Sequence, residues 1–401
     1  MVTEKLIRAL PKTDLHVHLD GSLRLGTLIE LARERDVRLP SRTKTGLRRL
    51  VFKDRYSSLT EYLKGFQYTV AVMQDPESLE RIACELAEDN FDEGVRYFEM
   101  RFAPQLHASK KMDMTAVLRA VNRGLSSAAR KANRRKEVRD GREPEFHYAI
   151  TVCALRYFNP QMSLYYKDIC RVHPFSPSKM VYGLGSLELA QAAVSIRDKR
   201  GIPITGFDLA GRERGFPAED HRRAYEFAHR NFLKKTVHAG EAYGPESIFQ
   251  AITDLHADRI GHGYYLVNPR MIKNPEIKDK AEYVRALAEY IADRRITVEV
   301  CLTSNLQTNP RLKDLSRHAF RDMRRRRLST TLCTDNRLIS NTTVTKEIMR
   351  AIKHFGISTK ELKHIIIYGF KRSFYPGSYT EKRDYVRKII DYYDEVVDWA
   401  P

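Results

Sequence analysis

Two histidines near the start of the chain, His16 and His18, are the residues whose type and spacing first suggest chemistry. They lie in residues 13–19, where polar and apolar side chains alternate, and such alternation predicts a β-strand. Side chains two residues apart on a strand point to the same face, so we expect both imidazoles to project together. Asp20 and Gly21 then break the pattern. Two imidazoles at the C-terminal end of a strand would form half of a divalent-metal site.

Further candidate groups follow later strand-like runs. His238 lies in the segment His-Ala-Gly-Glu241, and Asp335 directly follows residues 329–334. Three imidazole nitrogens and one carboxylate oxygen suit Zn²⁺, and the same donors also bind Fe²⁺, Co²⁺ and Mn²⁺. Such a metal lowers the pKa of a water molecule to about 7. Glu241 and His262 would add an acid and a base or orienting group, so the set predicts metal-assisted hydrolysis.

A repeated alternation of strand and helix patterns would position these residues. Eight β-type runs separated by amphipathic segments predict parallel βαβ units. Eight such units in 401 residues favour a (β/α)8 barrel of the TIM type, in which catalytic groups lie at the C-terminal ends of strands. The predicted strands are residues 13–19, 95–103, 146–153, 204–210, 235–239, 260–261, 296–302 and 329–334, and the predicted helices are residues 25–35, 76–94, 113–134, 186–200, 220–233, 245–255 and 281–295.

Two segments depart from this repeat. Residues 36–75 are first basic and then aromatic-rich, and we expect a helical insertion after the first strand that lies over the barrel mouth. Residues 359–401 are rich in Tyr, Lys and Asp, and they predict extra helices on the outside. The chain contains no internal repeat and no linker rich in Gly, Ser or Pro. Residues 1–401 are therefore expected to form a single domain.

The composition is that of an enzyme with a full core. Hydrophobic residues make up 42% of the chain and charged residues 30%. No apolar run approaches the roughly 18 residues of a membrane span, and the N-terminus has no apolar signal region. Five cysteines without a Cys-x-x-Cys pair do not predict a disulfide framework. We therefore expect a cytoplasmic protein without a membrane partner.

The chain carries a formal net charge of +19, which can indicate nucleic-acid binding. The charge is densest in residues 130–136 and 324–327, without interleaved aromatic residues, and such runs are typical of solvated helix faces. The zinc deaminases that flip bases use a His-x-Glu and Pro-Cys-x-x-Cys pattern, which this chain lacks. We therefore expect a small-molecule partner and no nucleic acid, and the sequence does not determine the oligomeric state.

Six motifs, in order, resemble those of the adenosine deaminase family of the amidohydrolase superfamily. They are His16-Val-His-Leu-Asp-Gly21, Asp208-Leu-Ala-Gly211, His238-Ala-Gly-Glu241, Arg259-Ile-Gly-His-Gly263, Ser304-Asn305 and Thr334-Asp335. The resemblance extends from Pro11 to about Gly369. It implies a zinc-containing (β/α)8 barrel that removes the 6-amino group of a purine.

The resemblance also implies a role for each candidate residue. Glu241 would be the protonated acid that donates to purine N1, and His262 would deprotonate or orient the water and stabilise the developing oxyanion. Asp335 would accept a hydrogen bond from that water as well as binding the metal. The implied metal ligands are His16, His18, His238 and Asp335.

The substrate contacts implied by the resemblance include two departures from the family pattern. The backbone of Gly211 would contact purine N3, and Asp20 would accept a hydrogen bond from a ribose hydroxyl. Asn336 stands where most members carry a second aspartate, and its amide could still donate to purine N7. Arg212 stands where an acidic residue is common, and a cation there would favour a substrate with an anionic substituent.

These residues predict an adenosine deaminase that converts adenosine and 2′-deoxyadenosine to inosine and 2′-deoxyinosine. The alternative is deamination of a modified adenine nucleoside such as aminofutalosine, which Arg212 and the basic surface favour. Adenine is less favoured, because relatives that act on the free base tend to carry Glu in place of Asp20. A barrel that has lost catalysis and only binds a ligand is disfavoured by the complete set of ligands and acid.

Overall fold

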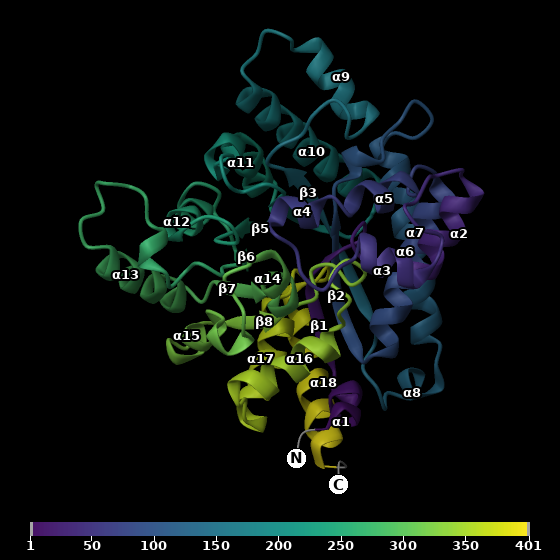
Figure 1. Cartoon of the computed structure of the whole chain (residues 1–401). Helices are drawn as coiled ribbons and strands as arrows, with labels where there is room; N and C mark the ends of the chain where they lie inside the picture. The colour runs from purple at the N-terminus through teal and green to yellow at the C-terminus, as the bar shows by residue number, and fades with distance from the viewer. Residues whose placement is uncertain (1–2, 399–401) are drawn as a thin grey trace.

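Eight parallel strands form the centre of the protein and are hydrogen-bonded to one another in chain order. A computed structural model describes residues 3–398 (Figure 1). The strands are β1 (Lys12–His18), β2 (Val95–Phe102), β3 (His147–Leu155), β4 (Ile204–Ala210), β5 (Lys234–Ala239), β6 (Arg259–His262), β7 (Thr297–Val300) and β8 (Thr330–Leu332). Helices surround these strands, so the predicted (β/α)8 barrel is confirmed.

The first and last strands meet where the barrel closes. The backbone N–H of Asp335 donates to the carbonyl of His16, and the N–H of His18 donates to the carbonyl of Asp335, both at 2.8 Å. The two bonds form a parallel bridge between Val17 and Asp335. Closure therefore brings the C-terminal end of β1 beside the segment that follows β8.

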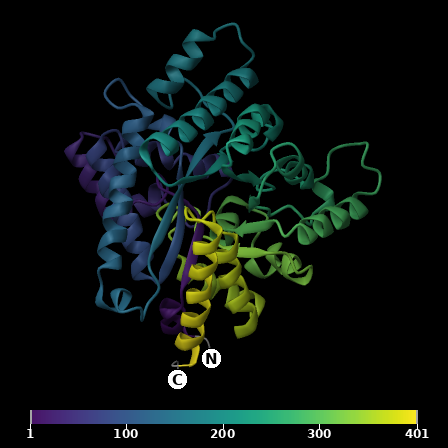
Figure 2. The ribbon, with the colours of Figure 1, turned by 180° about the vertical axis from the view of Figure 1, so that it is seen from behind.

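The helices lie outside the strands or in the loops at the strand ends. Figure 2 shows α17 and α18 side by side on the outside, and α17 packs against β1 and β8. The helices are α1 (Glu4–Ala9), α2 (Leu25–Glu34), α3 (Lys44–Leu50), α4 (Leu59–Leu63), α5 (Phe66–Ala71), α6 (Pro76–Asp92), α7 (Met114–Asn133), α8 (Lys136–Arg139), α9 (Leu164–Val172), α10 (Ser178–Arg200), α11 (Arg222–Arg230), α12 (Pro245–Thr253), α13 (Lys280–Asp293), α14 (Leu302–Thr308), α15 (Phe320–Arg325), α16 (Val344–Phe355), α17 (Thr359–Arg372) and α18 (Tyr379–Asp398). Short 3-10 helices span Pro104–Leu106, Ala218–His221, Pro269–Met271 and Leu315–Arg317.

Paired charges occupy the interior of the barrel. Arg101 on β2 donates to Asp208 at 2.9 Å and to Glu299 at 3.0 Å. Arg259 on β6 donates to Glu299 at 2.7 Å and also pairs with Glu99. All five side chains are buried, and an unpaired buried charge would be strongly destabilising. Burial alone would raise the pKa of Glu299, but the charges of Arg101 and Arg259 hold it below its usual range.

The predicted elements differ from the observed ones mainly in the helices. Each predicted strand overlaps an observed one, whereas the helix predicted over residues 186–200 begins earlier, at Ser178. Gly183 and Gly185 make that earlier segment resemble a loop. A Cβ on Gly183 would lie 2.5 Å from the carbonyl oxygen of Asp220, so this glycine allows close packing of α10. The sequence patterns also do not predict α9, α14, α15 and α16.

Three short helices, α3 to α5, lie within residues 36–75. The Arg48 guanidinium donates to the carbonyl of Leu338 at 2.8 Å, and the backbone N–H of Tyr56 donates to the carbonyl of Gln307 at 3.1 Å. Both carbonyls belong to segments that follow β7 and β8. The insertion is therefore hydrogen-bonded to the end of the barrel at which the strands finish.

The structure also bears on the composition-based expectations. Within residues 3–398, no helix combines the length and the apolar character that a membrane crossing requires. Cys153, Cys301 and Cys333 are buried, and all five cysteines are free thiols. Residues 399–401, at the end of the predicted C-terminal helices, lie outside the described residues.

Candidate metal centre and active site

His16 and His18 point to the same side of β1, as the period of a strand requires. Nδ1 of His16 lies 2.8 Å from a carboxylate oxygen of Glu299, which can only accept, so we assign the ring proton to Nδ1. Nε2 of His16 is buried and forms no hydrogen bond with any of residues 3–398. A carboxylate that orients a histidine in this way is typical of the surroundings of a metal ligand.

His238 and Asp335 reach the same point from β5 and from the segment after β8. Nε2 of His238 lies 3.1 Å from Nε2 of His18, and Nδ1 of His238 lies 3.1 Å from a carboxylate oxygen of Asp208. Oδ1 of Asp335 lies 3.5 Å from Nε2 of both His16 and His18. Four side chains from three separate parts of the chain therefore direct donor atoms at one buried point.

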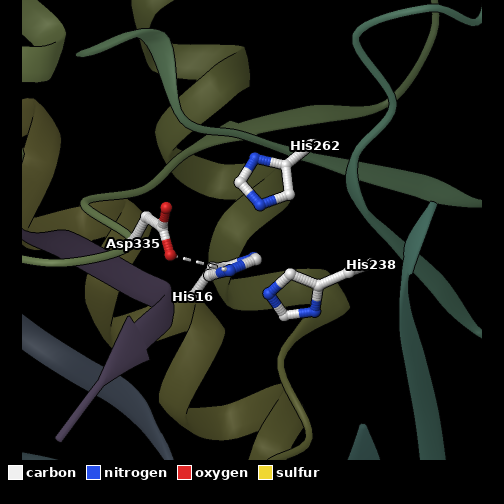
Figure 3. A group of neighbouring side chains, drawn as sticks. All are labelled: His16, His238, His262 and Asp335. Carbon is white, nitrogen blue, oxygen red and sulfur yellow. Dashed lines mark ion pairs between the residues drawn. The ribbon is translucent and has the colours of Figure 1, made fainter. Parts of the chain in front are cut away.

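A second grouping at the same point, with His262 in place of His18, also brings donor atoms close enough together for a divalent metal ion. One ligand atom each from His16, His238, His262 and Asp335 lies within 4.8 Å of the others, and all four residues are buried (Figure 3). Burial lowers the pKa of His18 and of His238, which favours the neutral imidazoles that bind metals. Burial alone would raise the pKa of Asp335, but the nearby imidazole of His16 and the charge of His262 hold it below its usual range. Neutral imidazoles and an ionised carboxylate are the donors that Zn²⁺ prefers.

The sequence analysis did not identify the charges that orient these ligands. Glu299 contacts His16, Asp208 contacts His238, and Arg101 bridges the two carboxylates. Arg101 therefore holds both orienting carboxylates in place from the interior of the barrel. The sequence did contain a signal, because charged residues occur inside otherwise apolar strands. Buried charges are tolerated only when they are paired, so such residues indicate a buried charge network.

Glu241 follows β5 and is buried close to the candidate ligands. Its Oε1 lies 3.8 Å from Nε2 of His262. Burial raises the pKa of Glu241 well above its usual range, and the negative charges of Asp335 and Glu213 raise it further. The surroundings therefore favour a protonated carboxyl group at this position, as a general acid requires.

Glu213 holds the loop that carries Glu241. Its carboxylate accepts hydrogen bonds from the backbone N–H groups of Gly240 at 2.7 Å, Ala242 at 2.6 Å and Tyr243 at 2.9 Å. The hydroxyl of Ser247 donates to the same carboxylate at 2.5 Å. These contacts hold the backbone on both sides of Glu241. The sequence analysis gave no role to Glu213, although it directly follows Arg212 and lies two residues after the Asp208-Leu-Ala-Gly211 motif.

A chain of three side chains sets the protonation of His262. The backbone N–H of Phe320 donates to Nδ1 of His318 at 3.0 Å, and burial lowers the pKa of His318 to about 3, so its proton lies on Nε2. Nε2 of His318 lies 3.0 Å from Oδ1 of Asn305, which accepts. The amide nitrogen of Asn305 then donates to Nδ1 of His262 at 3.2 Å. Neutral His262 therefore carries its proton on Nε2, the atom that faces Glu241.

The predicted substrate-binding residues lie at the same end of the barrel. Burial raises the pKa of Asp20 to about 7, and its Oδ1 has no hydrogen-bond partner among residues 3–398. The amide nitrogen of Asn336 donates to the hydroxyl of Tyr62 at 2.9 Å. Gly211 has a left-handed backbone, with φ of +94°, which favours glycine. Tyr62 belongs to α4, and the sequence analysis did not identify it.

Arg212 lies on the loop that follows β4. Its side chain is exposed, and its guanidinium lies over the ring of Phe216, 5.6 Å from the ring centroid. A cation in this position is accessible from solvent beside the end of the barrel that carries the candidate ligands.

Comparisons with known proteins agree with this arrangement. The sequence model of the family described as adenosine deaminase matches residues 11–162 and 179–392. The unmatched residues 163–178 contain α9. An adenosine deaminase of Mycolicibacterium vanbaalenii is 36% identical over 371 residues, which are 92% of this chain and 91% of that protein.

Solved structures of two other proteins share the fold. The N6-methyl-AMP deaminase of Arabidopsis thaliana is 26% identical with a TM-score of 0.72, covering 97% of this chain and 98% of its own. An amidohydrolase of Burkholderia ambifaria, solved with bound Zn, is 20% identical with a TM-score of 0.72, covering 99% of this chain and 95% of its own. The family match extends over most of the sequence and includes every candidate ligand, and the chain therefore belongs to the adenosine deaminase family.

Proposed function

We propose that this protein hydrolyses the 6-amino group of adenosine and 2′-deoxyadenosine, giving inosine or 2′-deoxyinosine and ammonia. The observation that carries the proposal is the buried point at which the candidate ligands converge, with Glu241 beside it. Several imidazoles and a carboxylate that can bind a metal, beside a separate carboxyl that can donate a proton, are the groups that metal-assisted hydrolysis needs.

His16, His18, His238 and Asp335 would hold the metal, and the donor chemistry favours Zn²⁺. When bound, such a metal lowers the pKa of a water molecule to about 7 and so supplies hydroxide near neutral pH. Glu299 and Asp208 orient His16 and His238 through their Nδ1 atoms, which keeps Nε2 of each ring free for the metal.

Glu241 would donate its proton to purine N1. Protonation there makes C6 electron-poor, so that addition of hydroxide to C6 becomes easier. The buried surroundings raise the pKa of Glu241 and so favour the protonated carboxyl, and the Glu213 carboxylate holds the loop that presents it. The proton of the new C6 hydroxyl group then passes to the amino group, and collapse of the tetrahedral intermediate breaks the C6–N bond and expels ammonia.

His262 would donate a hydrogen bond from Nε2 to the oxygen that becomes bonded to C6. The hydrogen-bond chain from His318 through Asn305 leaves Nδ1 of His262 as an acceptor. In this protonation state His262 stabilises developing negative charge and does not act as a base, since its outward nitrogen already carries a proton. The family resemblance allows His262 either to deprotonate the water or to orient it and stabilise the oxyanion. This geometry supports orientation and stabilisation.

The remaining residues would select the purine nucleoside. Asp20 would accept a hydrogen bond from a ribose hydroxyl, and the backbone of Gly211 would contact purine N3. One amide hydrogen of Asn336 is bonded to Tyr62, and the other would be available for purine N7. The exposed cation of Arg212 favours a second candidate, a modified adenine nucleoside with an anionic group, such as aminofutalosine.

A substrate panel would test the proposal. We would measure kcat/KM for adenosine, 2′-deoxyadenosine, adenine, AMP and aminofutalosine, with metal content determined by elemental analysis on the same preparation. We expect the highest kcat/KM for adenosine or 2′-deoxyadenosine and the loss of turnover when the metal is removed.

A matched pair of variants would test the second candidate. If Arg212 selects an anionic substrate, Arg212→Glu should lower kcat/KM for AMP or aminofutalosine, whereas Arg214→Glu, an equal charge change on the same loop, should not. Highest activity on adenine, or full turnover by metal-free protein, would contradict the proposed function.

A further inference from the structure

A second pocket, of about 610 Å³, lies at the end of the barrel opposite to the candidate active site. Lys234 and Arg259 line it, and these are the first residues of β5 and β6, whereas His238 and His262 lie at the other ends of the same strands. The last residues of α17 and the beginning of α18 complete its wall. A volume of this size falls in the usual range of small-molecule sites.

The lining of this pocket has a large excess of positive charge. Its one carboxylate, Asp258, pairs with Lys235 at 3.0 Å. Arg259 forms ion pairs with Glu99 and Glu299, which neutralise its charge. The other cations form no ion pair with any of residues 3–398. These cations are Lys234, Arg294, Arg295, Lys371, Arg372 and Lys382.

Helix dipoles account for only part of this charge. Cations are favoured at the C-terminal ends of helices, and Lys371 and Arg372 lie in the last turn of α17. Lys382, by contrast, is the fourth residue of α18, at the end where the helix dipole disfavours a cation. Its ammonium donates to the carbonyl of Ser373 at 2.7 Å. Ser373 is the residue that ends α17, so this ammonium satisfies a carbonyl at that helix end. Lys234, the first residue of β5, has no such role at a helix end.

The positive charges that line the pocket also repel one another. Burial lowers the pKa of Lys382 to about 8; Glu99 opposes this shift, and the charges of Arg259, Lys234 and Arg372 reinforce it. The charge of Lys235 lowers the pKa of His229, which lines the same pocket. A bound anion would offset this repulsion.

We propose that this pocket binds a polyphosphate chain, of the kind carried by a nucleoside triphosphate or by inorganic tripolyphosphate. Several phosphate groups in a short chain concentrate negative charge in a small volume. Such a ligand can interact with all six cations around one pocket at once. The extended backbone of a nucleic acid would instead favour a stripe of basic residues along the surface. The proposal does not depend on which purine the active site deaminates.

Calorimetric titration of the metal-loaded full chain with tripolyphosphate at constant ionic strength would test this site. The test variant combines Lys234→Glu, Arg294→Glu and Lys371→Glu, all at exposed positions. The matched control combines Lys199→Glu, Lys278→Glu and Arg317→Glu, which make the same charge change at exposed positions outside the pocket. We expect the test variant to bind at least about tenfold more weakly than the wild type, and the control to change Kd by less than about threefold.

Two further measurements identify what the pocket recognises: competition between ATP and tripolyphosphate, and titration with a single-stranded oligonucleotide. Competition between ATP and tripolyphosphate, lost in the test variant, would support recognition of the phosphate chain in both ligands. Equal weakening in both triple variants, no binding by the wild type, or binding only of a single-stranded oligonucleotide would overturn the proposal. Both variants should keep the wild-type kcat for nucleoside deamination, and if the triple variant does not fold, Lys371→Glu alone carries the test.

Discussion

Two buried glutamates near the candidate metal ligands have different surroundings, and the difference decides what each side chain can do. Glu241 faces His262 at 3.8 Å, and burial raises the pKa of Glu241. Glu213 accepts four hydrogen bonds from the loop and helix start that follow β5. The first is placed to give a proton to a substrate, whereas the second is placed to hold the backbone that carries the first.

Glu241→Gln should separate proton donation from binding. Glutamine has nearly the same shape and still donates a hydrogen bond, but it cannot readily release a proton. We expect metal content and substrate affinity to be retained while kcat falls by roughly 10² to 10⁴. Steady-state kinetics, elemental analysis and melting temperature on one preparation would check this. Near-normal kcat with a lower melting temperature would assign Glu241 to structure alone.

Glu213→Gln should lower kcat through the position of Glu241. The glutamine amide turns one acceptor oxygen into a donor that faces N–H or O–H groups, so at least one of the four hydrogen bonds is lost. We expect kcat to fall by about tenfold or more with metal content unchanged. Glu219→Gln, at an exposed position in the next turn, is the matched control and should leave kcat unchanged.

A double variant would show whether Glu213 acts through Glu241. If it does, Glu213→Gln should lower kcat much less when Glu241 is already Gln than when Glu241 is intact. Equal and additive losses in the two backgrounds would mean that Glu213 affects catalysis by another route.

At the scale of elements, one hydroxyl group on the insertion of α3 to α5 contacts two side chains of the segment after β8. Tyr62 on α4 contacts the Asn336 amide at 2.9 Å and the Ser340 hydroxyl at 2.7 Å. All three side chains are buried. The insertion therefore reaches a residue that we propose for purine recognition, and its position should affect substrate binding.

Tyr62→Phe should weaken substrate binding more than it affects the metal. Loss of the hydroxyl leaves buried polar groups of Asn336 and Ser340 without a partner, at a cost of about 1–2 kcal/mol. If that cost falls on the substrate-binding conformation, KM for adenosine rises by about fivefold to thirtyfold. Tyr68→Phe is the matched control, because the Tyr68 hydroxyl on α5 forms no hydrogen bond with any of residues 3–398. An equal rise of KM in both variants would contradict this role for Tyr62.

At the scale of the whole molecule, the charged network inside the barrel links catalysis at one end to stability at the other. Glu299 orients His16 toward the metal centre and also accepts from Arg259. Arg259 donates to the carbonyl of Arg372 at 2.9 Å, and its guanidinium lies over the ring of Phe374, 3.5 Å from the centroid. One set of buried charges therefore connects β6 and β7 to the junction between α17 and α18.

Arg259→Met should destabilise the whole barrel. It leaves Glu99 and Glu299 buried with fewer partners, and removing one member of a buried ion pair costs about 3–5 kcal/mol. Urea unfolding should show a lower free energy of unfolding by that amount, together with weaker metal retention through Glu299. Arg317→Met, at an exposed position, should change the free energy of unfolding by less than about 0.5 kcal/mol. A loss of similar size in both variants would mean that the buried network contributes little.

The sequence by itself determined the barrel and the positions of the candidate ligands along it. His16 and His18 share a face because a strand has a period of two, which is a local property. His238 and Asp335 were expected beside them, because parallel strands of a barrel end at the same face. The strand boundaries followed from the same patterns to within two residues at each end. The predicted run over 296–302, for example, continues past β7 into α14. The roles of these residues in metal binding and catalysis remain predictions.

Only the tertiary structure decided which groups orient and protonate the site. Arg101 meets Glu299 across 198 residues of sequence, and Asn305 meets His262 across 43, so no local pattern contains either contact. The helices α14 and α15, of seven and six residues, were missed because they are too short for a clear period. The basic pocket was also missed, because no local sequence pattern contains contacts between residues that are distant in the chain. Strands and helices distant in the chain contribute its cations, and the sequence records only their number, while the fold decides that they face one another.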